Sequence, residues 1–367
     1  MSCEKPSSDL LLHGSFCIIF KKSEIIERKV CMQTLSKNKR RAKRVCIILV
    51  ATVLSYVIFS MAGSAIVFRF IFARTNTVNA FELTYSDIDA EKYPRSEISF
   101  FSGDNRLCGF VYRPPGESAG LVLVANGINS CADRHLPEIL RFVDSGFSVF
   151  TFDNTGVGRS EGGGTVGIPQ ARIDTVAAIE YIRSEKDLAA LPLFLYGHSL
   201  GGYAVTTALL DEDDIRAVVC VSGFDSPNEN MRSSAKRYVG ILADAQYPFM
   251  CLQNYFLFGD KSDVSAVSAI NSTDTPVMIV GSNGDERIPY EISILNKADE
   301  ITNPNAVVVE IDDQYRSAHS SAWLSREAAR YLAETENPDD KARANVLDEE
   351  FMNSVISFYK NAVRKTR

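Results

Sequence analysis

A serine set between glycines, directly after a strand-like run, is the residue of this sequence best suited to nucleophilic chemistry. Ser199 lies in GHSLG, a G-x-S-x-G pattern that follows the apolar run LPLFLYG of residues 191–197. Between a strand and a helix, this pattern makes a sharp turn that lifts the serine hydroxyl above the sheet edge. The flanking glycines omit the Cβ atoms that would collide in that turn. We therefore expect Ser199 to be a nucleophile, with the backbone N–H of Leu200 aimed at developing negative charge.

A serine hydroxyl needs a neighbouring base, and the sequence offers four histidines. His13 precedes a long apolar run near the N-terminus, and His198 adjoins the serine, where the turn should direct its ring away. His135 lies at an expected helix start and is interpreted as a surface or capping residue. His319 lies in a loop just after the last strand-like run. We therefore expect His319 to be the base.

The acid that orients the histidine should follow the end of a preceding strand. Asp285 does so in TPVMIVGSNGDERIP. The chain order serine, aspartate, histidine is the order of the catalytic residues in folds whose nucleophile lies on a G-x-S-x-G turn. Glu286 and Asp225, the latter after the previous strand, remain alternatives. We expect Asp285 to be the acid.

Two glycine-containing loops follow the first central strands. VANGINS (residues 124–130) offers Gly127 for close approach and the backbone N–H of Ile128 as a second donor to an oxyanion. DNTGVGRSEG (residues 153–162) follows the next strand, where its glycines permit a tight turn. The first loop is expected to take part in chemistry and the second to be architectural.

The elements that would position these residues follow an alternating α/β pattern. Residues 98–114 form two alternating runs around Gly-Asp-Asn, which predicts a hairpin. Continuous apolar runs then alternate with helical patterns, at residues 121–125, 147–153, 191–197, 215–223, 275–281 and 306–312. This is typical of a mostly parallel sheet with helices on both faces.

Residues 225–274 interrupt the alternation, because they contain no strong strand signal. We interpret them as a small helical cap insertion over the strand ends, where open α/β sheets bind ligands. Its large apolar residues could line an acyl pocket or simply form core: Tyr238, Tyr247, Phe249, Met250, Tyr255 and Phe256.

The N-terminal part of the chain has the features of a membrane anchor. Val45–Phe68 is a run of 24 uncharged residues, longer than the roughly 20 that cross a bilayer core. Six basic residues lie in Lys37–Arg44, whereas only Arg69 and Arg74 follow closely on the other side. The positive-inside rule then places residues 1–44 in the cytoplasm and the catalytic body, residues 75–367, outside.

A cleaved signal peptide is the competing interpretation, since Met61–Ala65 is a passable cleavage site. Met32 would begin a conventional short basic segment before the helix, so a start there is also open. The eight cysteines show no CxxC pair and no metal-ligand spacing, although one disulfide among the four in the body remains open.

Charge limits the partners of the body. Residues 1–74 carry 13 lysines and arginines against 4 acidic residues, whereas the remainder carries 26 against 42. An acidic body argues against nucleic acid as a direct partner, because phosphate contacts need clustered Lys and Arg.

Three motifs carry a family resemblance: GHSLGG, the D-x-x-G-x-G-x-S loop and the later G-x-x-x-D-x-x-I-P. With them the chain resembles the α/β-hydrolases of the serine aminopeptidase and monoacylglycerol lipase-like group. More narrowly, it resembles membrane-anchored bacterial hydrolases. The resemblance covers residues 95–335 and implies the α/β-hydrolase fold. It also implies that Ser199, Asp285 and His319 form a catalytic triad, with an oxyanion hole from Ile128 and Leu200. Two departures stand out: Asn126-Gly127 replaces the usual His-Gly, and the aspartate comes one residue late.

The resemblance implies a serine hydrolase that cleaves an ester, thioester or amide through an acyl-serine intermediate, with no metal or organic cofactor. An aminopeptidase would need an acidic anchor for the substrate ammonium, for which Glu229 is a weak candidate. A fold used only for binding is the alternative outside enzymes. The expected partners are a small acyl ester, thioester or peptide substrate and, through Val45–Phe68, the membrane.

Overall fold

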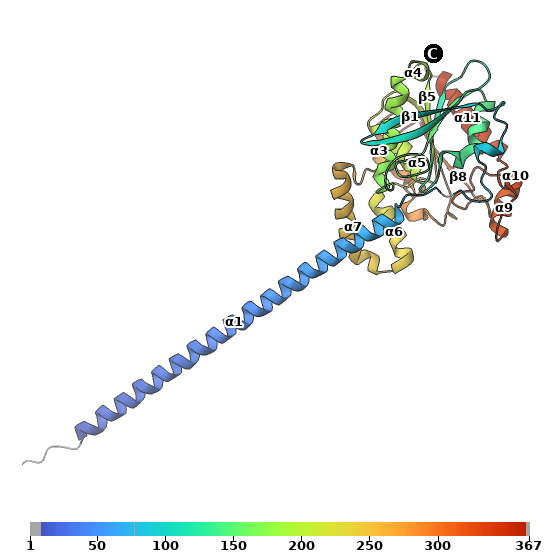
Figure 1. Cartoon of the computed structure of the whole chain (residues 1–367). Coiled ribbons are helices and arrows are strands. Elements are labelled where there is room, and N and C mark those ends of the chain that lie inside the picture. Colours follow the sequence, from blue (N-terminus) through green and yellow to red (C-terminus); the bar gives the residue numbers. More distant parts are fainter. Residues whose placement is uncertain (1–8, 77, 365–367) are drawn as a thin grey trace, which may run out of the picture. The chain divides into compact units, whose positions relative to one another are not determined.

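The computed structural model describes residues 9–76 and 78–364 (Figure 1). Contacts divide the chain into two compact units, Met1–Ala62 and Gly63–Arg367. The helix α1 (Asp9–Ile71) makes up the described part of the first unit and continues into the second. Within the described residues, it is the one helix long and apolar enough to cross a membrane. The predicted cytoplasmic segment 1–44 is thus helical from Asp9, while residues 1–8 lie outside the described residues.

The second unit is built on an eight-stranded sheet in the order β1-β2-β4-β3-β5-β6-β7-β8. The strands β1 and β2 form an antiparallel hairpin, β2 is also antiparallel to β4, and the remaining pairs are parallel. The strands are β1 (Arg95–Ser102), β2 (Asn105–Tyr112), β3 (Leu121–Ala125), β4 (Ser148–Phe152), β5 (Leu193–His198), β6 (Ile215–Val221), β7 (Val277–Gly281) and β8 (Ala306–Glu310). The predicted mostly parallel sheet is confirmed.

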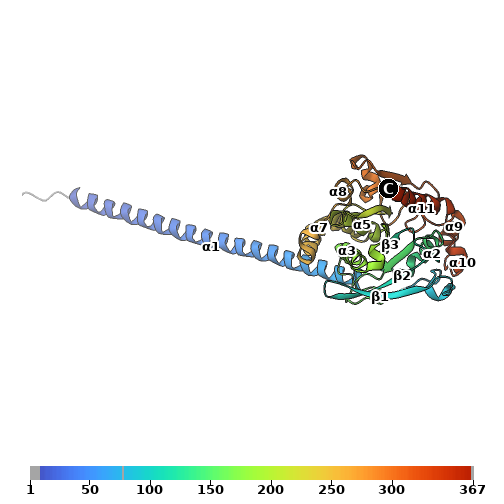
Figure 2. The ribbon, with the colours of Figure 1, turned by 90° about the horizontal axis from the view of Figure 1, so that it is seen from above.

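Helices cover both faces of this sheet, which is why β3, β4, β5 and β7 are buried along their whole length. Figure 2 shows α3 and α5 on one side of the central strands and α2 and α9 on the other. The helices are α2 (Leu136–Asp144), α3 (Ile168–Ser184), α4 (Lys186–Ala189), α5 (Leu200–Thr207), α6 (Pro227–Val239), α7 (Leu242–Phe258), α8 (Ala266–Asn271), α9 (Arg326–Glu334), α10 (Lys341–Ala344) and α11 (Glu349–Arg364).

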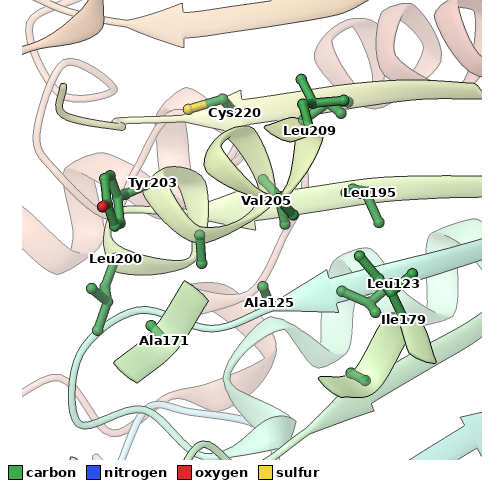
Figure 3. Packing of buried hydrophobic residues seen from close by; sticks show 14 of the residues in the cluster. Leu123, Ala125, Ala171, Ile179, Leu195, Leu200, Tyr203, Val205, Leu209 and Cys220 are labelled. Carbon is green, nitrogen blue, oxygen red and sulfur yellow. The ribbon is translucent and has the colours of Figure 1, made fainter. Parts of the chain in front are cut away.

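The helix α5, which follows the predicted nucleophile, packs on a buried apolar core. Figure 3 shows Leu123 and Leu195 of the sheet with Ile179 of α3 and Val205 of α5, all members of one buried cluster. Each such side chain stabilises the fold by about 1.5–3 kcal/mol through burial. The strand end at β5 and the start of α5 are therefore held on a rigid support.

The insertion between β6 and β7 forms α6, α7 and α8, as a helical cap would. Met250 is buried and Tyr247 is partly buried against the core. Tyr238 is 87% exposed and Phe256 69% exposed, and Tyr255 is also exposed. The aromatic residues of the insertion thus divide between core and surface.

The last residues of α1 and the segment that follows it belong to the second unit. Phe68 and Phe72 belong to its core. The Arg74 guanidinium donates hydrogen bonds to the carbonyl oxygens of Gly158, Ser160 and Gly162 at 2.7–3.0 Å. Residues 63–74, which the sequence pattern left as the end of the anchor and a spacer, therefore pack with the sheet domain.

The cysteines of this unit are free thiols: Cys108, Cys131, Cys220 and Cys251.

Candidate active site

The turn between β5 and α5 gives Ser199 an unusual backbone conformation. Its φ is 57° and its ψ is −117°, and its N–H donates to the carbonyl of Val221 over 2.8 Å. A Cβ atom at Gly197 would meet the carbonyl oxygen of Gly201, and one at Gly201 would meet that of Ala125. Both glycines are therefore required for the chain to turn here, and the strained serine stands at the end of a central strand.

The structure brings Ser199, His319 and Asp285 together in a chain of hydrogen bonds. His319 Nε2 lies 2.9 Å from Ser199 Oγ, and its Nδ1 lies 2.8 Å and 2.9 Å from the two oxygens of Asp285. The side chains are buried, and Asp285 also accepts the backbone N–H groups of Arg287 and Ile288. This arrangement fits a nucleophile, a base and a carboxylate that orients the base.

Two hydrogen bonds hold the backbone of His319, one at its carbonyl and one at its N–H. Its carbonyl lies 2.8 Å from His198 Nε2, and its N–H donates to a carboxylate oxygen of Glu286 over 3.1 Å. A carbonyl only accepts, so His198 Nε2 must carry the proton. Burial, and then the nearby rings of His319 and His135, hold the pKa of His198 well below its ordinary value. His198 is therefore a neutral donor.

The expectation that the His198 ring points away from the site is wrong. Its centroid lies 4.8 Å from that of His319 and 4.7 Å from that of Trp323. Its place beside the nucleophile was the only sequence signal for this contact, because the partner carbonyl comes from 121 residues further along the chain.

The interpretation of His135 as a surface or capping residue is also wrong. His135 is fully buried, its side chain caps no helix, and its Nδ1 lies 2.6 Å from Glu138 Oε1. The start of α2 faces the core, and a carboxylate three residues later supplies the partner that a buried imidazole needs. The His135 ring lies against the rings of His198 and Trp323, whereas it is the Nε2 of His319 that lies within hydrogen-bond distance of Ser199 Oγ.

The two alternative acids have other partners. Asp225 accepts from Lys297 Nζ over 2.7 Å and from the backbone N–H of Val267 over 2.8 Å. Glu286 binds the backbone of His319 rather than its ring. Neither carboxylate is recorded in contact with the imidazole of His319.

The loop after β3 closes on the serine. A Cβ atom at Gly127 would lie 3.6 Å from Ser199 Cβ, and Gly127 and Ile128 line the same cavity as the serine. Asn126, which stands where a histidine is usual, donates from Nδ2 to the carbonyl of Phe152 over 3.0 Å. The loop is thus tied to the end of β4.

The second glycine-containing loop is architectural, as its pattern predicts. Asp153 accepts the backbone N–H groups of Ala132 and Arg159 at 2.7 Å and 2.8 Å. The Ala132 bond joins this loop to the short 3-10 helix η2 (Ala132–His135), which begins just after the residues that close on the serine. The pKa of Asp153 is raised by burial.

A cavity of about 200 Å³ opens beside the serine. Its lining is polar and partly charged, and it comprises Asn79, Glu82, Gly127, Ile128, Asn129, Ser130, Arg134, His198, Ser199, Arg287, His319 and Ser320. The insertion aromatics are not among these residues, so the possibility that they line a pocket at the serine is not supported. Sequence reasoning missed Asn79, Glu82, Arg134 and Arg287, because no local pattern marks residues that meet only in the fold.

Comparison with known proteins agrees with this geometry. Residues 116–278 match the family model described as serine aminopeptidase, S33. The uncharacterized protein YfhR of Escherichia coli K12 is 28% identical over 186 residues, which cover 49% of this chain and 57% of that protein. Human monoglyceride lipase is 30% identical over 124 residues, covering 33% of this chain and 40% of the lipase. The chain thus spans about half the length of the curated relatives it matches.

Solved structures agree on the fold. An esterase from Pyrococcus furiosus superimposes with a TM-score of 0.56 at 17% identity, covering 79% of this chain and 98% of the esterase. The fold is that of the α/β-hydrolases, so the predicted fold class is confirmed. In sequence, the chain is similar to the serine aminopeptidase, S33 family over residues 116–278 and to human monoglyceride lipase over 124 residues.

Proposed function

We propose that this protein is a serine hydrolase that acts through an acyl-enzyme on Ser199. The observation that carries the proposal is the hydrogen-bond chain from Ser199 Oγ through the imidazole of His319 to Asp285, with distances of 2.9 Å and 2.8 Å. The strained turn that presents the serine supports the same role, since such strain clusters at functional sites.

In the first half of the proposed reaction, Ser199 Oγ attacks the carbonyl carbon of the substrate while His319 Nε2 takes the hydroxyl proton. Asp285 holds the Nδ1–H and stabilises the imidazolium. The backbone N–H groups of Ile128 and Leu200 receive the oxyanion. The carbon–oxygen, carbon–sulfur or carbon–nitrogen bond then breaks, and His319 returns the proton to the leaving group. The product of this half is an acyl-serine ester.

In the second half, His319 takes a proton from water, which attacks the acyl-serine carbonyl. The same two N–H groups hold the second oxyanion, and the Ser199 oxygen leaves with the proton that His319 carries. The free acid is released. All the groups that move protons in this scheme belong to the chain itself.

An ester or thioester fits the site better than a peptide with a free N-terminus. An aminopeptidase needs a carboxylate free to bind the substrate ammonium. Glu82 lines the cavity, but its oxygens accept hydrogen bonds from Asn79 and Arg134. Glu229 lies 3.7 Å from Lys297 Nζ. Both carboxylates therefore already have positive or hydrogen-bonding partners.

We further propose that α1 anchors the protein in a membrane through the first part of the run Val45–Phe68, since residues 63–68 belong to the compact unit of the sheet. The basic segment 1–44 then lies in the cytoplasm and the hydrolase domain outside. The support is the uncharged stretch within a helix of membrane-spanning length and the basic residues before it. In cells made permeable only on their outer side, added protease should degrade the hydrolase domain. A protected domain with a degraded N-terminus would reverse the orientation.

A matched substrate panel tests the bond class. Full-length protein in a neutral detergent should hydrolyse an acetyl ester and an acetyl thioester, and should be slow on an aminoacyl amide with a free amine. The Ser199→Ala variant should be inactive on every member of the panel. Faster turnover of the aminoacyl amide than of the ester would favour the peptidase.

A further inference from the structure

The lining of the cavity beside Ser199 includes two arginines. Arg134 and Arg287 line the same space of about 200 Å³ as the serine and Ile128. Any group bound in a space of this size lies close to both the reacting serine and the guanidinium groups. The positive charge of these two arginines should therefore influence which substrates can react.

Arg134 is a positioned cation with unused hydrogen-bonding capacity. Its side chain is 18% exposed, and its Nη1 lies 2.5 Å from Glu82 Oε1. A guanidinium has five N–H donors, and within the described residues Arg134 uses one side-chain nitrogen in a hydrogen bond to protein. Arg134 also lines the cavity, so it retains donors for a ligand there.

Glu82 cannot offer the same cavity a free acceptor. One of its oxygens accepts from both Arg134 Nη1 and Asn79 Nδ2, and the other accepts from the backbone N–H of Asn79 over 3.0 Å. The carboxylate therefore serves to hold Arg134 in place. This part of the cavity lining therefore presents mainly hydrogen-bond donors to a ligand.

Arg287 adds a second positive charge to the cavity lining. Its side chain is 69% exposed, and its ion pair with Glu286 spans 4.0 Å. An exposed pair of this length contributes little. Glu286 is itself turned toward the backbone of His319 through its other carboxylate oxygen. The Arg287 guanidinium is thus weakly engaged and can bind a substrate.

We propose that the natural substrate carries an anionic oxygen group, a carboxylate or a phosphate, near the scissile acyl bond, and that Arg134 and Arg287 bind it. This inference rests on the proposed serine hydrolase function. Planar guanidinium groups match the two oxygens of such anions with parallel hydrogen bonds. The small polar cavity suits this group better than a long acyl chain.

Matched pairs of substrates test the proposal with full-length protein at low ionic strength. On the acyl side, 4-nitrophenyl pentanoate is compared with the 4-nitrophenyl monoester of glutaric acid, which has a carboxylate at the chain end. On the alcohol side, the butyrate esters of 1-propanol, 3-hydroxypropanoate and 3-hydroxypropyl phosphate are compared. At least one anionic member should exceed its neutral partner by roughly tenfold in kcat/KM. The side and the anion that gain identify the group.

Variants assign this preference to the two arginines. Arg287→Ala should lower kcat/KM for the preferred anionic ester several-fold more than for its neutral partner. Arg287→Glu should lower it further. Arg113→Ala, at an exposed arginine outside the cavity lining, is the control and should change neither. Arg134→Lys keeps the charge beside Glu82 but loses the planar fork, and it should also reduce the preference.

Two results would overturn the proposal. One is equal kcat/KM for the neutral and anionic members of every pair. The other is an anionic preference that survives unchanged in Arg287→Ala and Arg134→Lys proteins that still hydrolyse the neutral esters. Failure of the underlying serine mechanism would look different, since neutral esters would then be hydrolysed equally by the Ser199→Ala protein.

Discussion

The proposed catalytic residues and the cavity lining of this domain are held in place by different kinds of structure. Ser199, Asp285 and His319 follow the ends of β5, β7 and β8. Hydrogen bonds between side chains and backbone groups hold the loops of Asp285 and His319. Asn79 and Glu82 precede the sheet, and the Glu82 carboxylate accepts hydrogen bonds from the side chains of Asn79 and Arg134. The proposed nucleophile and acid thus follow strands that are buried along their whole length, whereas the Glu82–Arg134 ion pair joins a loop to the 3-10 helix η2.

The two kinds of support correspond to two proposed roles, catalysis and the selection of substrates. Strand ends in a packed sheet give the accuracy that proton transfer requires, because the core leaves them little freedom. Loops tolerate change, so residues on them can alter substrate preference without disturbing the reacting groups. Substitutions in the first region should therefore affect turnover, and those in the second should affect selectivity.

The largest expected effect comes from removing the base. His319→Ala should lower kcat by roughly a thousandfold or more, because Ser199 then has no proton acceptor. His135→Ala serves as the matched control: it should keep most of the rate and lose stability, since Glu138 would be buried without its partner. Ester hydrolysis and thermal unfolding measure the two effects. A folded His319→Ala protein with a near-normal rate would contradict the assignment.

A smaller effect is expected at His198, whose hydrogen bond goes to the backbone of the His319 loop. His198→Ala should lower kcat by about tenfold with little change in KM, since it removes one hydrogen bond that positions the base. His198→Gln should recover part of the rate, because its amide can donate to the same carbonyl. Equal rates for the two variants would show that ring packing, and not the hydrogen bond, is what matters.

How much of this could be read from the sequence depends on how local each signal is. The strand before Ser199, the glycines around it and the helix after it lie within a dozen residues, so the turn was predictable. His319 and Asp285 could be selected because few histidines were available and each lies after a strand. The Glu82–Arg134 pair joins segments 52 residues apart, and the burial of His135 depends on which face of α2 meets the core. Such contacts arise only from tertiary packing.

Substitution at the Glu82–Arg134 pair in the cavity lining should have a smaller effect than substitution of His198. Glu82→Gln keeps the shape but removes the charge that holds Arg134, so kcat/KM for the preferred substrate should change about threefold, mostly in KM. Asp87→Asn, which weakens a surface ion pair with Lys341, is the control and should have no effect on kcat/KM. A large loss of kcat in Glu82→Gln would mean that this pair takes part in the chemistry.

The smallest expected effect concerns the stability of folding at mildly acidic pH. Burial and the neighbouring His319 and His135 lower the pKa of His198 in the folded protein from the ordinary 6.5. Below that pH the unfolded chain binds a proton that folded His198 does not, so the free energy of unfolding should fall as the pH decreases. One such group contributes at most about 1.4 kcal/mol per pH unit. Urea unfolding at pH 7.5 and 5.5 should show a smaller fall in His198→Gln than in the unchanged protein.

The most direct test of the central claim is covalent labelling of the nucleophile. A fluorophosphonate should add one phosphonyl group to the full-length protein, and peptide mass mapping should locate it on Ser199. The Ser199→Ala protein should remain folded and unlabelled, and His319→Ala should be labelled far more slowly. Equal labelling of folded Ser199→Ala protein, or a phosphonyl group on another residue, would contradict the account.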